Sequence, residues 1–167
     1  MDGSCENFAN ARSVSGTIDN EEAPLTPVAS ILVVANQTAL SAGLSEALRA
    51  RLEEGPATFT LVVPLGHVPN AREEAERLAA GLREAGLPVR AVPGDLDPLC
   101  AVVDVYSPAE YDEIIVSTLP AEQSRWMKAG LPQRIARQTG ALVRHVEAGS
   151  PHPFHRSHRA LAGARHA

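Results

Sequence analysis

Short apolar runs alternate along this chain with segments whose apolar residues recur at helical spacing. The first run, Ile31–Ala35, is apolar throughout, which is typical of a parallel strand that is covered on both faces. The segment after it repeats apolar residues at helical spacing from Leu40 to Leu52. Because the two kinds of segment keep alternating as far as Val146, the chain is expected to form one α/β domain.

Five strands and four helices are expected in this alternation. The expected strands are Ile31–Ala35, Phe59–Val63, Val89–Val92, Glu113–Ser117 and Ala141–Val146. The expected helices cover Leu40–Leu52, the segment between Asn70 and Gly86, Pro98–Tyr106, and Leu131 to near Gly140. Short links between strands and helices imply right-handed crossovers, and therefore a parallel, doubly wound sheet with helices on both faces.

Two of these helices begin at residues that are typical of helix N-termini. Asn70 is followed by Glu73 at the spacing of a capping box. Asp97 is a favoured N-cap residue, and Pro98 suits the first helical position. Both helices are therefore expected to start with a side-chain cap.

The two ends of the chain differ in composition from the segment between them. Residues 1–28 are polar, carry five acidic side chains against Arg12, and are expected to form a disordered or loosely attached arm. Residues 148–167 mix glycine, proline, histidine and arginine, and they are expected to form a flexible tail. The folded domain is therefore expected to cover residues 29–147.

Charge, hydropathy and cysteine usage narrow the class of protein. The formal net charge is −5 and no basic block occurs, so a nucleic acid is not an expected partner. No apolar run approaches the roughly 20 residues of a membrane span, and Met1–Val28 lacks the pattern of a signal peptide. Cys5 and Cys100 form no metal or redox motif. We therefore expect a cytoplasmic protein with free thiols and no membrane partner.

Two loops form the candidate ligand site. Ligands of doubly wound domains bind beyond the carboxyl ends of the strands, where the strand order reverses, and the first and fourth strands commonly flank that point. The candidate pocket residues in the loops after these strands are Asn36, Thr38, Ser117, Thr118, Arg125 and Gly130. In the competing interpretation, Trp126 and Met127 pack the second loop shut.

No residue pattern indicates a catalytic or metal site. A receiver domain needs acidic residues after the first strand to hold Mg²⁺, where this chain has Asn36 and Gln37, and a serine hydrolase needs Gly-x-Ser-x-Gly. Ser117 and His145 end adjacent strands, and we interpret them as a loop-capping hydroxyl and a partly exposed histidine. Cys100 is interpreted as a small core residue. The tail histidines are interpreted as solvated side chains rather than metal ligands: His152, His155 and His158.

The segment Ile31–Leu52 resembles the start of the universal stress protein family. In that family the first strand usually ends in Asp-Gly-Ser, and this chain has Asn36-Gln37-Thr38 there. The segment from Leu131 to Val143 is similar to the last helix and strand of the family, so the resemblance extends from Ser30 to Val146. It implies the family's five-stranded parallel sheet with the strand order 3-2-1-4-5.

The phosphate-binding motif of that family is altered in this chain. Nucleotide-binding members carry Gly-x2-Gly-x9-Gly-Ser/Thr after the fourth strand, and in a gapless register those positions are Ser117, Pro120, Gly130 and Leu131. Pro120 has no N–H to offer a phosphate, Leu131 has no hydroxyl, and Glu122 adds a negative charge. We therefore expect that the loop does not bind ATP tightly and that no cofactor is held.

The resemblance implies a regulatory or ligand-binding module without catalytic activity. The second loop keeps polar and cationic side chains that suit a small anion other than a nucleotide: Ser117, Thr118, Gln123, Ser124, Arg125 and Lys128. The resemblance also implies a homodimer through the edge of the fifth strand, Ala141–Val146, because an unpaired edge strand invites a partner.

The alternative is an ATP- or AMP-binding, or ATP-hydrolysing, member of the adenine-nucleotide-hydrolase-like superfamily. Asn36 and Thr38 would then lie near the base or ribose, with Ser117, Thr118 and Gly130 near the phosphates. The motifs supply no evident general base or Mg²⁺-binding carboxylate for that chemistry.

Overall fold

Six strands and five helices form the part of the chain that the computed structural model describes, residues 26–149 and 156–159. The strands are β1 (Ala29–Val34), β2 (Ala57–Pro64), β3 (Val89–Gly94), β4 (Glu113–Thr118), β5 (Leu142–Glu147) and β6 (Arg156–Arg159). The helices are α1 (Ala42–Glu54), α2 (Ala71–Glu84), α3 (Pro98–Val105), α4 (Arg125–Lys128) and α5 (Leu131–Thr139). In this described part, no helix is both long and apolar enough to cross a membrane.

The strands form one sheet in the order β3-β2-β1-β4-β5-β6. Strands β1 to β5 are all parallel, which confirms the predicted doubly wound sheet and its 3-2-1-4-5 order. Val34 fixes the register at the centre, because it pairs with Val62 of β2 and with Val116 of β4. The strand order reverses between β1 and β4, so the loops that follow these two strands meet at the switch point of the fold.

The sixth strand was not expected from the sequence, which places residues 148–167 in a flexible tail. Arg156–Arg159 instead form β6, which is antiparallel to β5, with Leu142 opposite Arg159 and His145 opposite Arg156. The physical reason is the edge of β5, whose backbone N–H and C=O groups need partners. Other expectations for the ends of the chain, including the arm over residues 1–25 and the roles of His152 and His155, lie outside the described residues.

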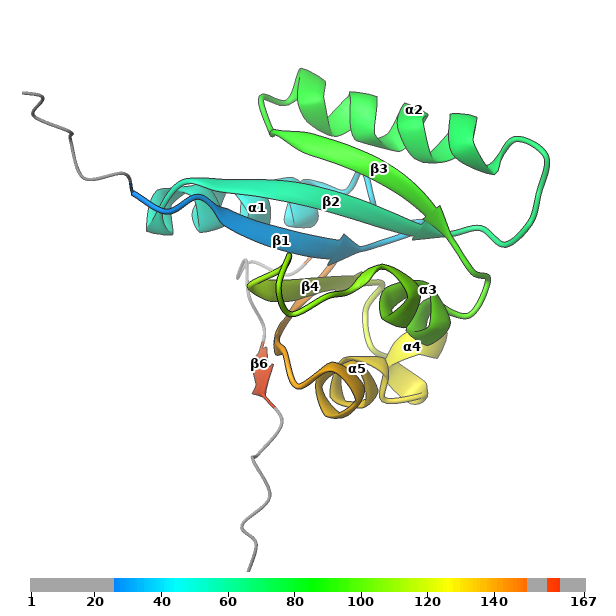
Figure 1. Cartoon of the computed structure of the whole chain (residues 1–167). Helices are drawn as coiled ribbons and strands as arrows, with labels where there is room; N and C mark the ends of the chain where they lie inside the picture. The colour runs from blue at the N-terminus through cyan, green and yellow to red at the C-terminus, as the bar shows by residue number, and fades with distance from the viewer. Residues whose placement is uncertain (1–25, 150–155, 160–167) are drawn as a thin grey trace, which may run out of the picture.

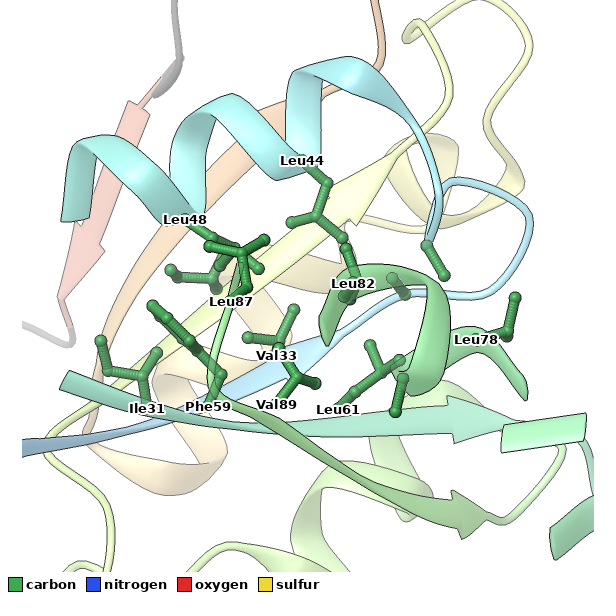
Figure 2. Close-up of a cluster of buried hydrophobic side chains, with 14 of the residues drawn as sticks. Ile31, Val33, Leu44, Leu48, Phe59, Leu61, Leu78, Leu82, Leu87 and Val89 are labelled. Carbon is green, nitrogen blue, oxygen red and sulfur yellow. The ribbon is translucent and has the colours of Figure 1, made fainter. Parts of the chain in front are cut away.

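Helices cover both faces of the sheet (Figure 1), with α1 and α2 on one face and α3 and α5 on the other. On the first face, Figure 2 shows Leu44 and Leu48 of α1 and Leu82 of α2 above Phe59 and Val33. All five side chains are buried, and each is worth about 1.5–3 kcal/mol of transfer free energy. This cluster is therefore a main source of stability for the domain.

The second face has its own apolar cluster, which lies nearer to the switch point. Leu32 and Val116 from the sheet pack there with Val102 of α3 and with Leu131 and Ile135 of α5. Because successive residues of a strand point to opposite faces, β1 and β4 supply side chains to both clusters. The apolar runs that predicted these strands are explained by this double coverage.

The two predicted helix caps have different outcomes. The Asp97 carboxylate accepts hydrogen bonds from the backbone N–H groups of Leu99 (2.8 Å) and Cys100 (3.1 Å), so this cap is confirmed. The predicted capping box at α2 is wrong, because the Asn70 side chain makes no cap hydrogen bond. Asn70 has φ −101° and ψ 16°, whereas a capping side chain needs the extended backbone of a normal N-cap residue.

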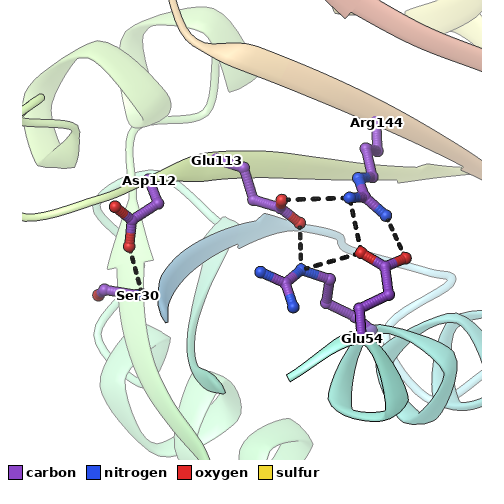
Figure 3. Close-up of polar contacts among 6 residues, drawn as sticks. Ser30, Glu54, Asp112, Glu113 and Arg144 are labelled. Carbon is purple, nitrogen blue, oxygen red and sulfur yellow. Dashed lines mark hydrogen bonds and ion pairs between the residues drawn. The ribbon is translucent and has the colours of Figure 1, made fainter. Parts of the chain in front are cut away.

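A cluster of ion pairs joins α1 to β4 and β5, remote from the switch point (Figure 3). Arg144 donates to both carboxylate oxygens of Glu54, at 2.7 and 2.8 Å, and Arg51 donates to Glu113 at 3.1 Å. The hydrogen bonds from Arg144 lower the pKa of Glu54. Burial raises the pKa of Glu113, because desolvation outweighs the attraction of Arg144 and Arg51. The pKa values of the two carboxylates are therefore shifted in opposite directions.

Candidate functional site

A pocket of about 380 Å³ lies at the switch point, between the loop after β1 and the loop after β4. From the first loop it is lined by Asn36, Gln37 and Thr38. From the second loop it is lined by Thr118, Leu119, Gln123, Ser124, Arg125 and Trp126. The second loop is therefore not packed shut, since Trp126 forms part of the pocket wall.

Four of the six candidate residues line this pocket: Asn36, Thr38, Thr118 and Arg125. The other two occupy structural positions near it. Ser117 is buried and its hydroxyl donates to Thr38 Oγ1 at 2.8 Å. Gly130 is the N-cap residue of α5 and has a left-handed backbone with φ 64°, a conformation that glycine adopts without strain. The turn into α5 explains why this position is a glycine, and a role of Gly130 in ligand binding stays a prediction.

A buried hydrogen-bond chain supports Thr118 from behind. The Thr118 hydroxyl donates to the Leu119 carbonyl oxygen at 2.8 Å, and His145 Nε2 lies 2.8 Å from the same hydroxyl oxygen. Since a hydroxyl carries one proton, we assign the His145 Nε2–H as donor to Thr118. One lone pair of Thr118 Oγ1 is then left as an acceptor at the pocket.

The position of His145 corrects the sequence interpretation. This histidine is 3% exposed rather than partly exposed, and it contacts Thr118. The register explains the difference: His145 pairs with Val116, and Thr118 follows Val116 by two residues on the same face of the sheet. Ser117 points to the opposite face and reaches Thr38.

Two further lining residues are held by hydrogen bonds to the backbone. Asn36 Nδ2 donates to the carbonyl oxygen of Pro64 at 3.1 Å, which fixes the orientation of its amide. Ser124 is buried, and its oxygen accepts a hydrogen bond from the N–H of Met127 at 3.2 Å, as the N-cap of α4. The pocket therefore presents pre-oriented polar groups from both loops.

Arg125 is the one charged residue among the described residues that line the pocket. Lys128, which the sequence places in the same cationic lip, is exposed and does not line the pocket, and neither does Glu122. No carboxylate belongs to the described lining, so the wall offers neither a carboxylate ligand for a hard cation nor a carboxylate base. The local charge favours an anion of low charge.

The altered positions of the phosphate motif serve the fold of this loop. Leu131 is 1% exposed and belongs to the second apolar cluster. The Pro120 carbonyl oxygen accepts from the N–H groups of Gln123 at 2.8 Å and Ser124 at 2.9 Å, which closes a turn. Restoring serine at position 131 would therefore disturb packing, whereas glycine at position 120 keeps the carbonyl oxygen that closes the turn.

Gln123 and Ser124 were among the side chains expected to suit an anion, but three other lining residues were not predicted: Gln37, Leu119 and Trp126. Each lies in one of the two loops that the topology rule indicates, so the loop was predicted although the residue was not. In the second loop, the α4 turn brings Trp126 to the pocket. That turn is too short to leave an apolar period in the sequence.

Cys100 was expected in the core, but the structure places it on the exposed side of α3. The neighbouring residues Ala101 and Val102 are the ones that α3 buries. Partial desolvation, followed by the negative charges of Asp97 and Asp95, raises the pKa of the Cys100 thiol. Because the thiolate is the nucleophile, this setting does not activate the cysteine.

The fold and the pocket together define a doubly wound α/β domain with an open polar crevice at its switch point. Neither a protein-family model nor a curated protein sequence matches the chain. Among solved structures, the chain is similar to a universal stress protein in complex with cAMP, with 15% sequence identity and a TM-score of 0.49. The matched region covers 73% of this chain and 98% of that chain. At this identity the comparison concerns the fold alone.

Proposed function

We propose that this protein is a cytoplasmic, non-catalytic binding module of the universal-stress-protein type, which senses a small ligand in the pocket at the switch point. The observation that carries the proposal is the pocket itself, with polar groups from both loops and one guanidinium, that of Arg125. Ligand sites of doubly wound folds lie at this place. A binding role is also supported by the absence of carboxylates from the described lining.

The proposal includes weak binding of ATP. A triphosphate needs several backbone N–H groups and cations, whereas this loop has Pro120 in place of an amide donor and Leu131 buried in the core. Each missing hydrogen bond to a charged group removes about 1.5–3 kcal/mol of binding free energy. Two missing bonds would weaken affinity on the order of 10² to 10⁴-fold.

Trp126 allows a direct test, because it is the only tryptophan of the chain and it lines the pocket. Its fluorescence and its indole N–H signal in NMR spectra report on this site alone. We expect a saturable change with at least one member of a chemically diverse set of small polar molecules, and no saturation with ATP at micromolar concentration. The set includes ADP, AMP and cAMP.

A blocked variant serves as the control for this test. Gln37→Tyr replaces an exposed lining residue by a larger side chain and should abolish the response to any ligand that binds in the pocket. If no molecule of the set changes the Trp126 signal in the native protein, the binding proposal is wrong. Tight binding of ATP followed by its hydrolysis would support the alternative of a nucleotide-hydrolysing enzyme.

We also propose that pairing of two copies through β5 requires the departure of β6. The edge of β5 that was expected to bind a second copy is paired with β6 over Leu142–His145. A second copy and β6 would use the same backbone groups, so the two pairings exclude each other. The proposal makes the oligomeric state dependent on a segment of the same chain.

A further inference from the structure

The pocket combines a single positive charge with many neutral polar groups. Arg125 is its one charged residue among those described, and the remaining polar side chains are carboxamides, hydroxyls and the indole of Trp126. A guanidinium binds a carboxylate or a phosphate oxygen pair through two parallel hydrogen bonds. One such group on a ligand is matched by this pocket, whereas several anionic groups would be left without partners.

The neutral groups require a ligand that both donates and accepts hydrogen bonds. Thr118 donates its proton to Leu119 and accepts from His145 with one lone pair. Its second lone pair is left to accept a hydrogen bond from a ligand. Thr38 lines the pocket, and its hydroxyl accepts from Ser117 and therefore keeps its own proton to donate. A carboxamide such as Asn36 presents an acceptor and a donor side by side.

Hydroxyl groups meet this requirement better than phosphate groups do. An ionised phosphate oxygen accepts hydrogen bonds and donates none, so the Thr118 oxygen and the amide oxygens would remain unpaired beside it. Leaving such partly buried acceptors unpaired weakens binding. A hydroxyl can donate to Thr118 and accept from Thr38 at once.

Trp126 adds an apolar surface to one wall of the pocket. Its side chain is half-buried and packs against the second apolar cluster, so it is held in place. The C–H groups of a ring that carries hydroxyls can lie on an aromatic surface of this kind. The pocket thus has a place for each part of a hydroxylated ring with one acidic substituent.

We propose that the ligand of this pocket is a small polyhydroxylated molecule with a single anionic group, of the sugar-acid or sugar-phosphate class. The inference rests on the proposed binding function and specifies its ligand class. Arg125 binds the anionic group, the carboxamides and Thr118 bind hydroxyls, and Trp126 lies against the ring. The class excludes polyanions such as nucleoside triphosphates.

The test is a titration of the full chain with four probes, read from Trp126 fluorescence and confirmed by calorimetry. D-glucuronate and D-glucose 6-phosphate carry hydroxyls and one anionic group, D-glucose lacks the anion, and benzoate lacks the hydroxyls. We expect saturation with one or both of the first pair, and affinity about ten-fold or more lower for the other two. Whichever of D-glucuronate and D-glucose 6-phosphate binds more tightly shows whether the pocket prefers a carboxylate or a phosphate.

A pair of variants on α4 identifies the group that binds the anion. Arg125→Gln should lower the affinity for the better probe by about ten-fold or more, whereas Lys128→Gln should leave it unchanged, since Lys128 is exposed and outside the lining. Both residues are exposed, so thermal unfolding of both variants should match the native chain.

The outcomes separate the ligand class from the binding function. If neither anionic sugar saturates while another molecule of the diverse set does, the ligand class is overturned and the binding function stands. Equal affinity for D-glucose and D-glucuronate, or equal loss in both variants, would also overturn the class. If nothing in either set saturates, the binding function itself fails.

Discussion

Thr118 connects the domain core to the pocket at the scale of a single residue. The residue is 2% exposed, and its hydroxyl joins His145 of β5 to the Leu119 carbonyl oxygen. Buried polar groups keep their place only when their hydrogen bonds are satisfied. The same contacts that stabilise the strand ends therefore orient the pocket acceptor.

Replacement of Thr118 by valine should destabilise the domain although the side-chain shape is kept. The Thr118→Val variant removes a buried hydroxyl that bonds to His145 and to the Leu119 carbonyl oxygen, which costs about 1–3 kcal/mol of unfolding free energy. Urea denaturation at neutral pH measures this difference. Thr58→Val, at an exposed position of β2, is the control and should stay within about 0.5 kcal/mol of the native chain. Equal effects of the two variants would contradict the assigned hydrogen bond.

Glu54 and Glu113 should shift acid stability in opposite directions. The pKa of Glu54 is lowered by its hydrogen bonds to Arg144, so its contribution is present above 4.5 and is lost as the pH falls through the lowered value. The stability gap between the native chain and Glu54→Gln should therefore shrink on acidification. The gap should be small, because the Glu54 side chain is exposed and solvent screens its ion pair.

Glu113 provides the matched comparison in the same ion-pair cluster. Burial raises its pKa, so its contribution to stability is fully present below 4.5 and is lost as the pH rises through the raised value. Relative to Glu113→Gln, the native chain should gain stability on acidification. Urea unfolding of both variants from pH 7 to pH 3.5, in roughly half-unit steps, checks the two signs. The same sign for both would show that desolvation does not dominate at Glu113.

Side-chain direction at the strand ends decides which polar residues become partners. Ser117 and His145 end neighbouring strands, but their side chains make hydrogen bonds to different partners. The register sends His145 to the face of Thr118 and sends Ser117 to the face of Thr38, and register depends on pairing that the sequence does not print. Which polar residues lie near the site was predictable, whereas their partners were not.

At the scale of elements, the start of α3 is fixed by a side chain and the start of α2 is not. Asp97 accepts two backbone hydrogen bonds, while Asn70 makes no side-chain cap bond. Asp97→Ala should therefore lower the unfolding free energy by about 0.5–2 kcal/mol, and Asn70→Ala should change it by less than about 0.5 kcal/mol. Thermal and urea unfolding of the two variants measure this contrast. An equal loss in both would restore the capping role of Asn70.

The spacing of apolar residues predicted the five parallel strands and the four longer helices. A strand that is buried on both faces is apolar throughout, and a helix that is buried on one face has apolar residues at helical spacing. The elements that were missed leave no such pattern. α4 has four residues, fewer than are needed to show a helical period, and it owes its start to Ser124. β6 is polar along its length, and its pairing follows from the open edge of β5. Neighbouring elements determine both.

At the scale of the whole molecule, the topology places the pocket and the loops determine its chemistry. The reversal of strand order between β1 and β4 was predictable, and it brings two loops together that are far apart in the sequence. The shape of the second loop depends on Pro120, Ser124 and the α4 turn, which act together in three dimensions. The location of the pocket could therefore be predicted from the sequence, while Gln37, Leu119 and Trp126 of its lining could not.

The sheet edge at β5 gives the last prediction, at the same scale. β6 covers Leu142–His145 in the full chain, so a variant that ends at Gly149 exposes the backbone groups of that edge. An uncovered edge strand pairs with another strand when one is available, so the shortened variant should form dimers at concentrations where the full chain is monomeric. Light scattering coupled to size-exclusion chromatography, at matched concentrations, measures both proteins. Adding Leu142→Lys to the shortened variant should return it to the monomer, because a charge at an edge opposes pairing. If the shortened variant stays monomeric, or the full chain dimerises to the same extent, β6 does not control association through β5.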